Sequence, residues 1–140
     1  MKIWKNYLLP LALTTLLSAC SLFDDNSLPN GSAPGAGTWK VSYFFDKSDE
    51  TNYYSGYTFE FGDNGQLTAT NGSQVYSGSW STGFDDSKNK FLINFNGSHP
   101  SALEELEEDW LIIEQSSDFM HFKHTSGGNG DTDVLQFSKD

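Results

Sequence analysis

Residues 57–80, YTFEFGDNGQLTATNGSQVYSGSW, set the architecture expected of this chain. Apolar side chains alternate with polar ones in this stretch, which is the period of two expected of strands with one buried face. Asp63-Asn64-Gly65 and Asn71-Gly72-Ser73 separate the runs with residues that accept a positive φ, as tight hairpin turns require. The stretch therefore predicts consecutive antiparallel strands joined by short hairpins.

The same pattern continues on both sides of this stretch. Eight runs rich in aromatic and β-branched residues are expected to be strands, at 38–46, 54–62, 65–71, 74–82, 89–96, 109–116, 118–125 and 132–138. An open sheet this rich in aromatic residues would leave unpaired edges, so we expect an all-β, eight-stranded antiparallel up-and-down barrel.

One segment departs from the strand pattern. Pro100 near a start, Ser101 with Glu104 as a capping-box pair, and Leu103 with Leu106 at helical spacing predict one short amphipathic helix near 100–108. We expect its leucines to cover one end of the barrel.

The N-terminus has the features of a secretory signal. Lys2 and Lys5 precede an apolar run, residues 7–17, that is too short to span a bilayer comfortably. The run ends in Leu17-Ser18-Ala19-Cys20, which resembles the lipobox of bacterial lipoproteins. That resemblance implies a signal peptide over 1–19 and acylation of Cys20, the only cysteine of the chain.

The segment after Cys20 is polar and rich in Ser, Gly, Pro and Asn, so residues 20–36 are expected to form the lipidated cysteine and a flexible tether. Removal of Lys2 and Lys5 leaves six lysines, no arginine and 19 acidic residues, a net charge of −13. Such a charge disfavours nucleic acid as a partner, and it leaves attachment to the lipid bilayer to the acyl chains.

The localisation is expected to be the cell envelope. Ser21, in place of the Asp that resembles an inner-membrane retention signal, favours the outer membrane. Asp24-Asp25 resembles the surface-export signals of some lipoproteins, although a solvated linker explains the same pair equally well.

A family resemblance spans residues 37–140. Gly37-Thr38-Trp39 resembles the Gly-x-Trp signature of lipocalins, although avidin-like barrels also open with Gly-Thr-Trp. The whole succession is similar to small lipocalin-like lipoproteins of Gram-negative bacteria; it continues through 56–61, 64–65, 78–80, 103–110 and 135–139. The resemblance implies that Trp39 packs at the closed end of the barrel against an arginine of the last strand. Lys139 is the only late-strand cation here, so Gly37, Trp39 and Lys139 form the expected structural signature.

Motifs for catalysis are missing from the sequence. No Gly-x-Ser-x-Gly, phosphate loop or His-Glu-x-x-His occurs, so we expect no enzyme and no cofactor. His121 and His124 fall on opposite faces of one strand and are not expected to chelate one metal ion. The acidic runs, and the Gly127–Val134 segment that superficially resembles a calcium repeat, are interpreted as solvated charge and a hairpin loop, so we expect no metal site.

The aromatic residues carry the functional hypothesis. An eight-stranded barrel is just wide enough to be filled by its side chains or to hold one small ligand. In the first case the chain binds a protein or a glycan, or acts as an inhibitor, through exposed loops such as Phe84-Asp85-Asp86. In the second it is a monomeric carrier of a small apolar or amphipathic ligand. The interior residues expected to contact such a ligand are Tyr43, Tyr57, Phe59, Tyr76, Trp80, Phe91 and Trp110.

Overall fold

The computed structural model describes residues 32–128 and 130–140. The expected signal peptide, the expected acylation site at Cys20 and the tether as far as residue 31 lie outside these residues. Within the described residues, no helix is long and apolar enough to cross a membrane.

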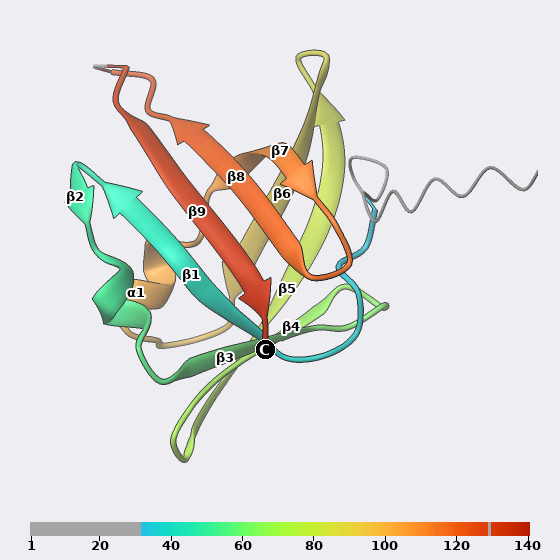
Figure 1. Ribbon diagram of the computed structural model, residues 1–140, viewed down its shortest axis with the longest axis vertical. Coiled ribbons are helices and arrows are strands. Elements are labelled where there is room, and N and C mark those ends of the chain that lie inside the picture. Colours follow the sequence, from blue (N-terminus) through green and yellow to red (C-terminus); the bar gives the residue numbers. More distant parts are fainter. Residues whose placement is uncertain (1–31, 129) are drawn as a thin grey trace, which may run out of the picture.

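The described residues form nine strands and two short helices (Figure 1). In chain order they are β1 (Trp39–Asp46), β2 (Ser48–Asp49), the 3₁₀ helix η1 (Thr51–Tyr54), β3 (Tyr57–Phe61), β4 (Gln66–Asn71), β5 (Gln74–Asp85), β6 (Lys88–Phe95), α1 (Ser101–Glu104), β7 (Asp109–Gln115), β8 (Phe119–Thr125) and β9 (Thr132–Lys139).

Eight of the strands close into a barrel. From β3 to β9 each strand pairs antiparallel with the next, and β1 pairs with both β3 and β9. The β1–β9 ladder runs from Trp39 opposite Lys139 to Phe45 opposite Val134. The short β2 only extends the end of β1 as a hairpin. The predicted eight-stranded antiparallel barrel is therefore confirmed.

An even number of alternating strands places both termini of the barrel at one end. We call this the anchor end; it holds residues 32–38, the loops at 62–65, 86–87 and 116–118, and Lys139. The opposite end, the mouth, holds η1, α1, the loop at 72–73 and the loop residues 126–128 and 130–131. Figure 1 shows the blue segment that begins at residue 32 on the right of the barrel and α1 on the left. The described chain therefore enters the barrel at the end opposite the mouth.

Strand β1 contains an irregularity that changes which side chains face inward. The register with β9 shifts between Val41 and Tyr43. Before the shift the odd-numbered Trp39 is buried, and after it the even-numbered Phe44 is buried. Tyr43 stacks on Phe45, with ring centroids 6.5 Å apart, on the face opposite buried Phe44. The expectation that Tyr43 lines the interior is corrected, because the β-bulge adds one residue and reverses the alternation.

Helix α1 covers the mouth but is shorter than the predicted segment. Leu103 and Leu106 are fully buried, as expected of a cover. Pro100 is the N-cap and no side chain caps the helix, so the expected Ser101–Glu104 capping box does not form. The reason is positional, because Ser101 is the first residue inside the helix and a capping box needs it at the N-cap.

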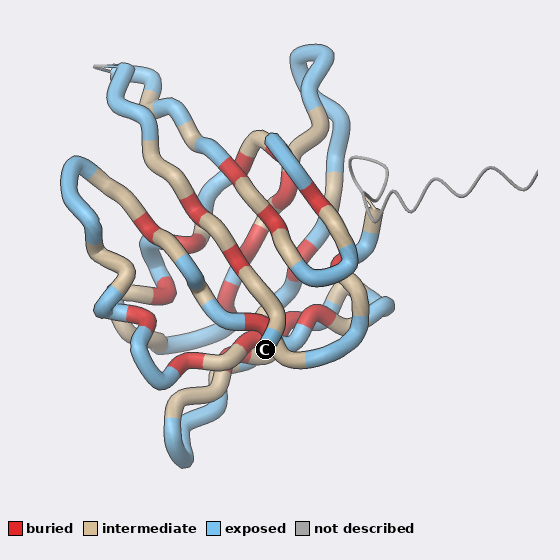
Figure 2. The backbone as a smooth tube through the Cα atoms, viewed as in Figure 1, coloured by how far each residue is buried: buried red, intermediate tan, exposed pale blue. Residues whose placement is uncertain are grey.

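The core lies inside the barrel as one cluster of 20 buried apolar side chains. Figure 2 shows buried positions recurring along the strands, with exposed positions concentrated in the loops. This arrangement follows from the alternation in the sequence, since one face of each strand must leave water.

Candidate ligand pocket at the mouth of the barrel

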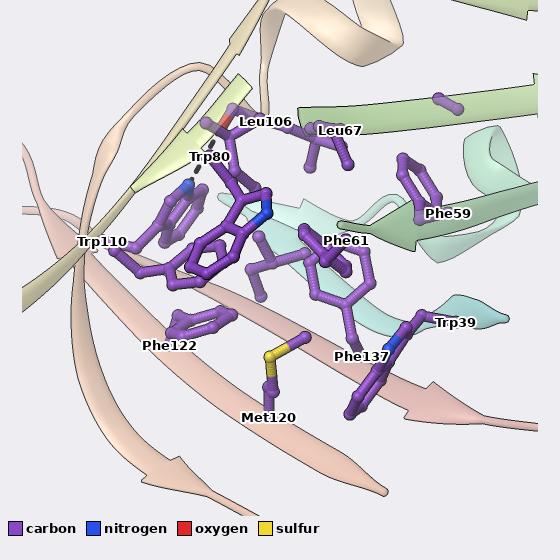
Figure 3. Packing of buried hydrophobic residues seen from close by; sticks show 14 of the residues in the cluster. Trp39, Phe59, Phe61, Leu67, Trp80, Leu106, Trp110, Met120, Phe122 and Phe137 are labelled. Carbon is purple, nitrogen blue, oxygen red and sulfur yellow. Dashed lines mark hydrogen bonds between the residues drawn. The ribbon is translucent and has the colours of Figure 1, made fainter. Parts of the chain in front are cut away.

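The lumen of the barrel is filled by aromatic rings. Phe91 stacks between Trp80 and Phe122, with centroid separations of 5.6 Å and 4.9 Å. Phe61 makes edge contacts with Phe91 at 5.8 Å and with Phe137 at 5.4 Å. Figure 3 shows Trp80, Phe61, Phe122 and Phe137 in one packed group. Ring separations of this size are those of direct aromatic packing, so the rings themselves occupy the centre of the lumen.

A pocket of about 500 Å³ opens at the mouth, between η1 and α1. It is lined by Glu50, Tyr53, Tyr54, Tyr57, Asn71, Pro100, Ser101, Ala102 and Glu105. Its size falls in the range of small-molecule sites, and its lining combines aromatic faces with a few polar groups.

Each wall of the pocket is held by a different part of the fold. The Thr51 hydroxyl accepts a hydrogen bond from the Phe44 backbone N–H at 3.0 Å, which fixes η1 to the end of β1. Tyr54 then packs edge-on against Phe44, with ring centroids 5.1 Å apart. On the other side, the Trp110 indole N–H donates to the Leu106 carbonyl at 3.0 Å and holds the turn after α1. The pocket is therefore bounded by anchored elements.

The pocket is electronegative. It carries the carboxylates of Glu50 and Glu105, and no lysine is among its described lining residues. Burial, followed by the charges of Glu105 and Glu50, raises the pKa of the Tyr54 hydroxyl far above its usual value, so Tyr54 stays neutral. Burial also raises the pKa of Glu105, with like-charge repulsion from Asp46 and Glu50 among the further causes.

The structure places the expected ligand residues in three environments. Phe59, Trp80, Phe91 and Trp110 are buried in the packed lumen. Tyr76 is half-buried against the core, and Tyr43 lies outside it. Tyr57 alone among the seven also lines the mouth pocket.

Sequence reasoning missed most of the pocket. Tyr53, Tyr54 and Glu50 lie in a segment whose pattern indicates only a turn and the start of a strand, and the acidic run around Glu105 indicates a solvated face. The adjacent tyrosines at 53–54 are the available signal. Without the topology, nothing in the sequence joins them to α1.

The expected signature residues meet at the anchor end. Trp39 is fully buried, and its indole N–H donates to the Gly35 carbonyl at 3.0 Å. The Lys139 ammonium lies 4.9 Å from the centroid of the Trp39 ring. Lys139 thus occupies the place where the lipocalin resemblance implies an arginine, and Gly37, with a φ of 125°, brings the backbone past it.

A second cluster of polar groups lies beside the mouth. His124 Nδ1 is 3.3 Å from Asp109, and His124 Nε2 is 3.6 Å from Glu108. These three residues are the group among the described residues whose ligand atoms are near enough to hold a metal ion. The two ring nitrogens face different carboxylates, and Asp109 also binds Lys90 at 3.1 Å, so the contacts are those of an ion-pair network.

Comparison with known proteins shows the fold alone. No protein-family model matches the chain, and no curated protein matches it. The crystal structure of a DUF4847 family protein from Bacteroides vulgatus ATCC 8482 is similar, with a TM-score of 0.51 and 17% sequence identity. The match covers 76% of this chain and 94% of that chain.

Proposed function

We propose that this protein is an acyl-anchored binding protein of the outer membrane that holds a small amphipathic molecule in the mouth pocket. In this proposal the chain is monomeric and catalyses no reaction. Its packed lumen supports the barrel and does not hold the ligand. The expected acylation of Cys20 supplies the anchor.

The contrast between the filled lumen and the open mouth carries this proposal. Phe59, Phe91 and Phe122 are fully buried, so a ligand in the lumen would have to displace packed rings. The mouth pocket already offers about 500 Å³, and Tyr53 at its rim is 66% exposed. A ligand there would gain aromatic contacts without unpacking the core.

The topology suits an anchored protein. The chain enters the barrel at the anchor end, and the mouth pocket lies at the other end. A bilayer attached through Cys20 would face the anchor end and leave the pocket open to the surrounding solution.

The test is a binding map by NMR. The chain from residue 20, with Cys20→Ser to keep it free of lipid, is titrated with octyl amphiphiles that carry different headgroups. The proposal expects amide shifts at residues 50–57, 71 and 101–105. Tyr53→Ala removes an exposed ring from the rim and should weaken binding. Phe84→Ala is the matched control, because it removes a 73% exposed ring from the opposite end.

Two results would overturn the proposal. Shifts centred on Phe59, Phe91 and Phe122 would place the ligand in the lumen. An absence of shifts with every amphiphile, together with native mass spectra free of any co-purified ligand, would leave the mouth pocket without a binding role.

The packed lumen also favours a second function, a protein or glycan interaction module without a small ligand. Phe84, near the tip of the β5–β6 hairpin, is 73% exposed. It is part of the Phe84-Asp85-Asp86 segment that is expected to contact a partner. A photo-crosslinker at position 84 that forms one defined adduct on intact cells, where the same group at position 53 forms none, would support this function.

A further inference from the structure

The charges at the mouth are strongly one-sided. A second pocket, of about 450 Å³, adjoins the first through their shared residue Glu105. It is lined by Asp46, Lys47, Glu105, Glu108, Ser126, Gly128, Asp131 and Asp133. Across both pockets, the described lining residues include six carboxylates and one ammonium group. An anionic headgroup would be repelled here, whereas a cation would be attracted.

The first pocket also contains a largely buried polar group that is open to a ligand. Tyr54 is only 4% exposed and lines the pocket. Its hydroxyl takes part in none of the side-chain hydrogen bonds formed among the described residues, and its ring packs against Phe44. Among the described residues, the Tyr54 oxygen is not one of the fully buried side-chain atoms that lack a partner, so it keeps access to the pocket and can accept a hydrogen bond from a ligand there.

We infer that the ligand of the mouth pocket is an organic amine in its ammonium form, bound by Glu50, Glu105 and the Tyr54 hydroxyl. This inference rests on the proposed function, because it names the chemical class of the molecule in the same pocket. The ammonium N–H groups donate to the two carboxylates and to the hydroxyl oxygen of Tyr54. The tyrosine rings supply faces that attract a cation.

The experiment compares ligands that share one chain. Octylammonium, octanol and octanoate differ in headgroup charge, and calorimetric titration of the chain from residue 20 with Cys20→Ser measures each. Octylammonium should bind about tenfold more tightly than octanol, the ratio expected of a charge-assisted contact of roughly 1.4 kcal/mol. Octanoate should bind more weakly than octanol. Added salt should weaken octylammonium binding, because the pocket is open to screening.

Variants separate the ammonium contacts from the general charge of the protein. Glu50→Gln with Glu105→Gln should weaken octylammonium about tenfold and leave octanol unchanged. Glu114→Gln, which removes an exposed acid on β7 near the anchor end, should change neither. Tyr54→Phe should weaken octylammonium but not octyltrimethylammonium, which has no N–H to donate.

The outcomes distinguish this inference from the proposed function. Equal binding of octanol and octylammonium at the mouth would overturn the amine and leave the proposed function standing. Equal loss of affinity in the Glu114 variant and the Glu50/Glu105 variant would also overturn it, because net charge would then explain the preference. If none of the four ligands binds, both the amine inference and the proposed function are overturned.

Discussion

At the scale of single residues, Trp39 and Lys139 form a close contact at the anchor end of the barrel. The Lys139 ammonium lies over the Trp39 ring, and its amine is near Gly35, where a Cβ would approach it to 2.8 Å. The absence of a side chain at Gly35 makes room for the lysine head. The pair therefore combines a cation–π contact with a close backbone approach.

We predict that Lys139→Ala lowers the free energy of unfolding by about 0.5–1 kcal/mol, the value typical of a partly exposed cation–π contact. Lys139→Arg should keep most of this stability, because a guanidinium also stacks on an indole. Urea denaturation measures both. Lys40→Ala is the control, since Lys40 pairs with the exposed carboxylate of Asp140. Equal losses at 139 and 40 would contradict a specific role for the ring contact.

A second residue-scale prediction concerns pH. Burial first, then like charges on Asp46, Glu50, Glu104 and Glu108, raise the pKa of Glu105. The folded state therefore keeps a proton on Glu105 that the unfolded state has already lost, and stability falls as pH rises from the unfolded pKa through the folded one. Above this interval Glu105→Gln should be more stable than the wild type by about 0.5 kcal/mol, and the difference should vanish in acid.

Asp109 provides the control of opposite sign. Its hydrogen bond from Lys90 is the largest cause that lowers the pKa of Asp109. Its contribution to stability is present above the unfolded pKa and is lost as pH falls through the folded one. Asp109→Asn should therefore destabilise the protein at neutral pH, as measured by thermal unfolding across a pH series. If both variants shifted stability in the same direction, the electrostatic assignment would be wrong.

At the scale of elements, β5 shows why one glycine is required and another is not. β5 pairs with β4 over its first half and with β6 over its second, and Gly78 takes part in both ladders. A Cβ on Gly78 would overlap the backbone oxygen of Asn94. A Cβ on Gly83 of the same strand would meet nothing within 4 Å. Close approach of the β6 backbone thus determines the residue at 78.

We predict that Gly78→Ala lowers the free energy of unfolding by about 1–3 kcal/mol, the usual cost of forcing extra atoms into a packed site. Gly83→Ala should change it little, or raise it slightly through the reduced freedom of the unfolded chain. Chemical denaturation of both variants measures the difference. A Gly78 variant as stable as the Gly83 variant would contradict so close an approach of β6 to β5.

At the scale of the whole molecule, the end of the expected tether is part of the barrel. We call residues 32–36 the strap. Pro34 is buried, the Gln115 amide donates to the Ser32 carbonyl at 2.7 Å, and the Trp39 indole donates to the Gly35 carbonyl at 3.0 Å. The expectation of a tether through residue 36 is thus modified, since its last five residues cover the anchor end.

We predict that a chain beginning at Gly37 is less stable than one beginning at Ser32 by about 2 kcal/mol, because two partly buried hydrogen bonds of roughly 1 kcal/mol each are lost. Gln115 is 1% exposed, and its Oε1 already lacks a partner among the described residues. Gln115→Leu should therefore restore part of the stability of the shorter chain. Equal urea midpoints for the two chains would show that the strap contributes nothing.

The number of barrel strands, their hairpin connections and their order follow from the amino-acid pattern alone. These features depend on alternation and on turn residues that act over a few neighbouring positions, such as Asn64-Gly65 and Asn71-Gly72. The buried leucines at 103 and 106 are also predictable, because their spacing alone identifies an apolar face.

Whether the lumen is full, and where a pocket lies, depends instead on contacts between distant segments. These contacts are the bulge that turns Tyr43 outward, the stacking of Phe91 between Trp80 and Phe122, and the approach of η1 to α1. Local patterns indicate which side chains leave water, but the volume they enclose is fixed only when all the strands close together.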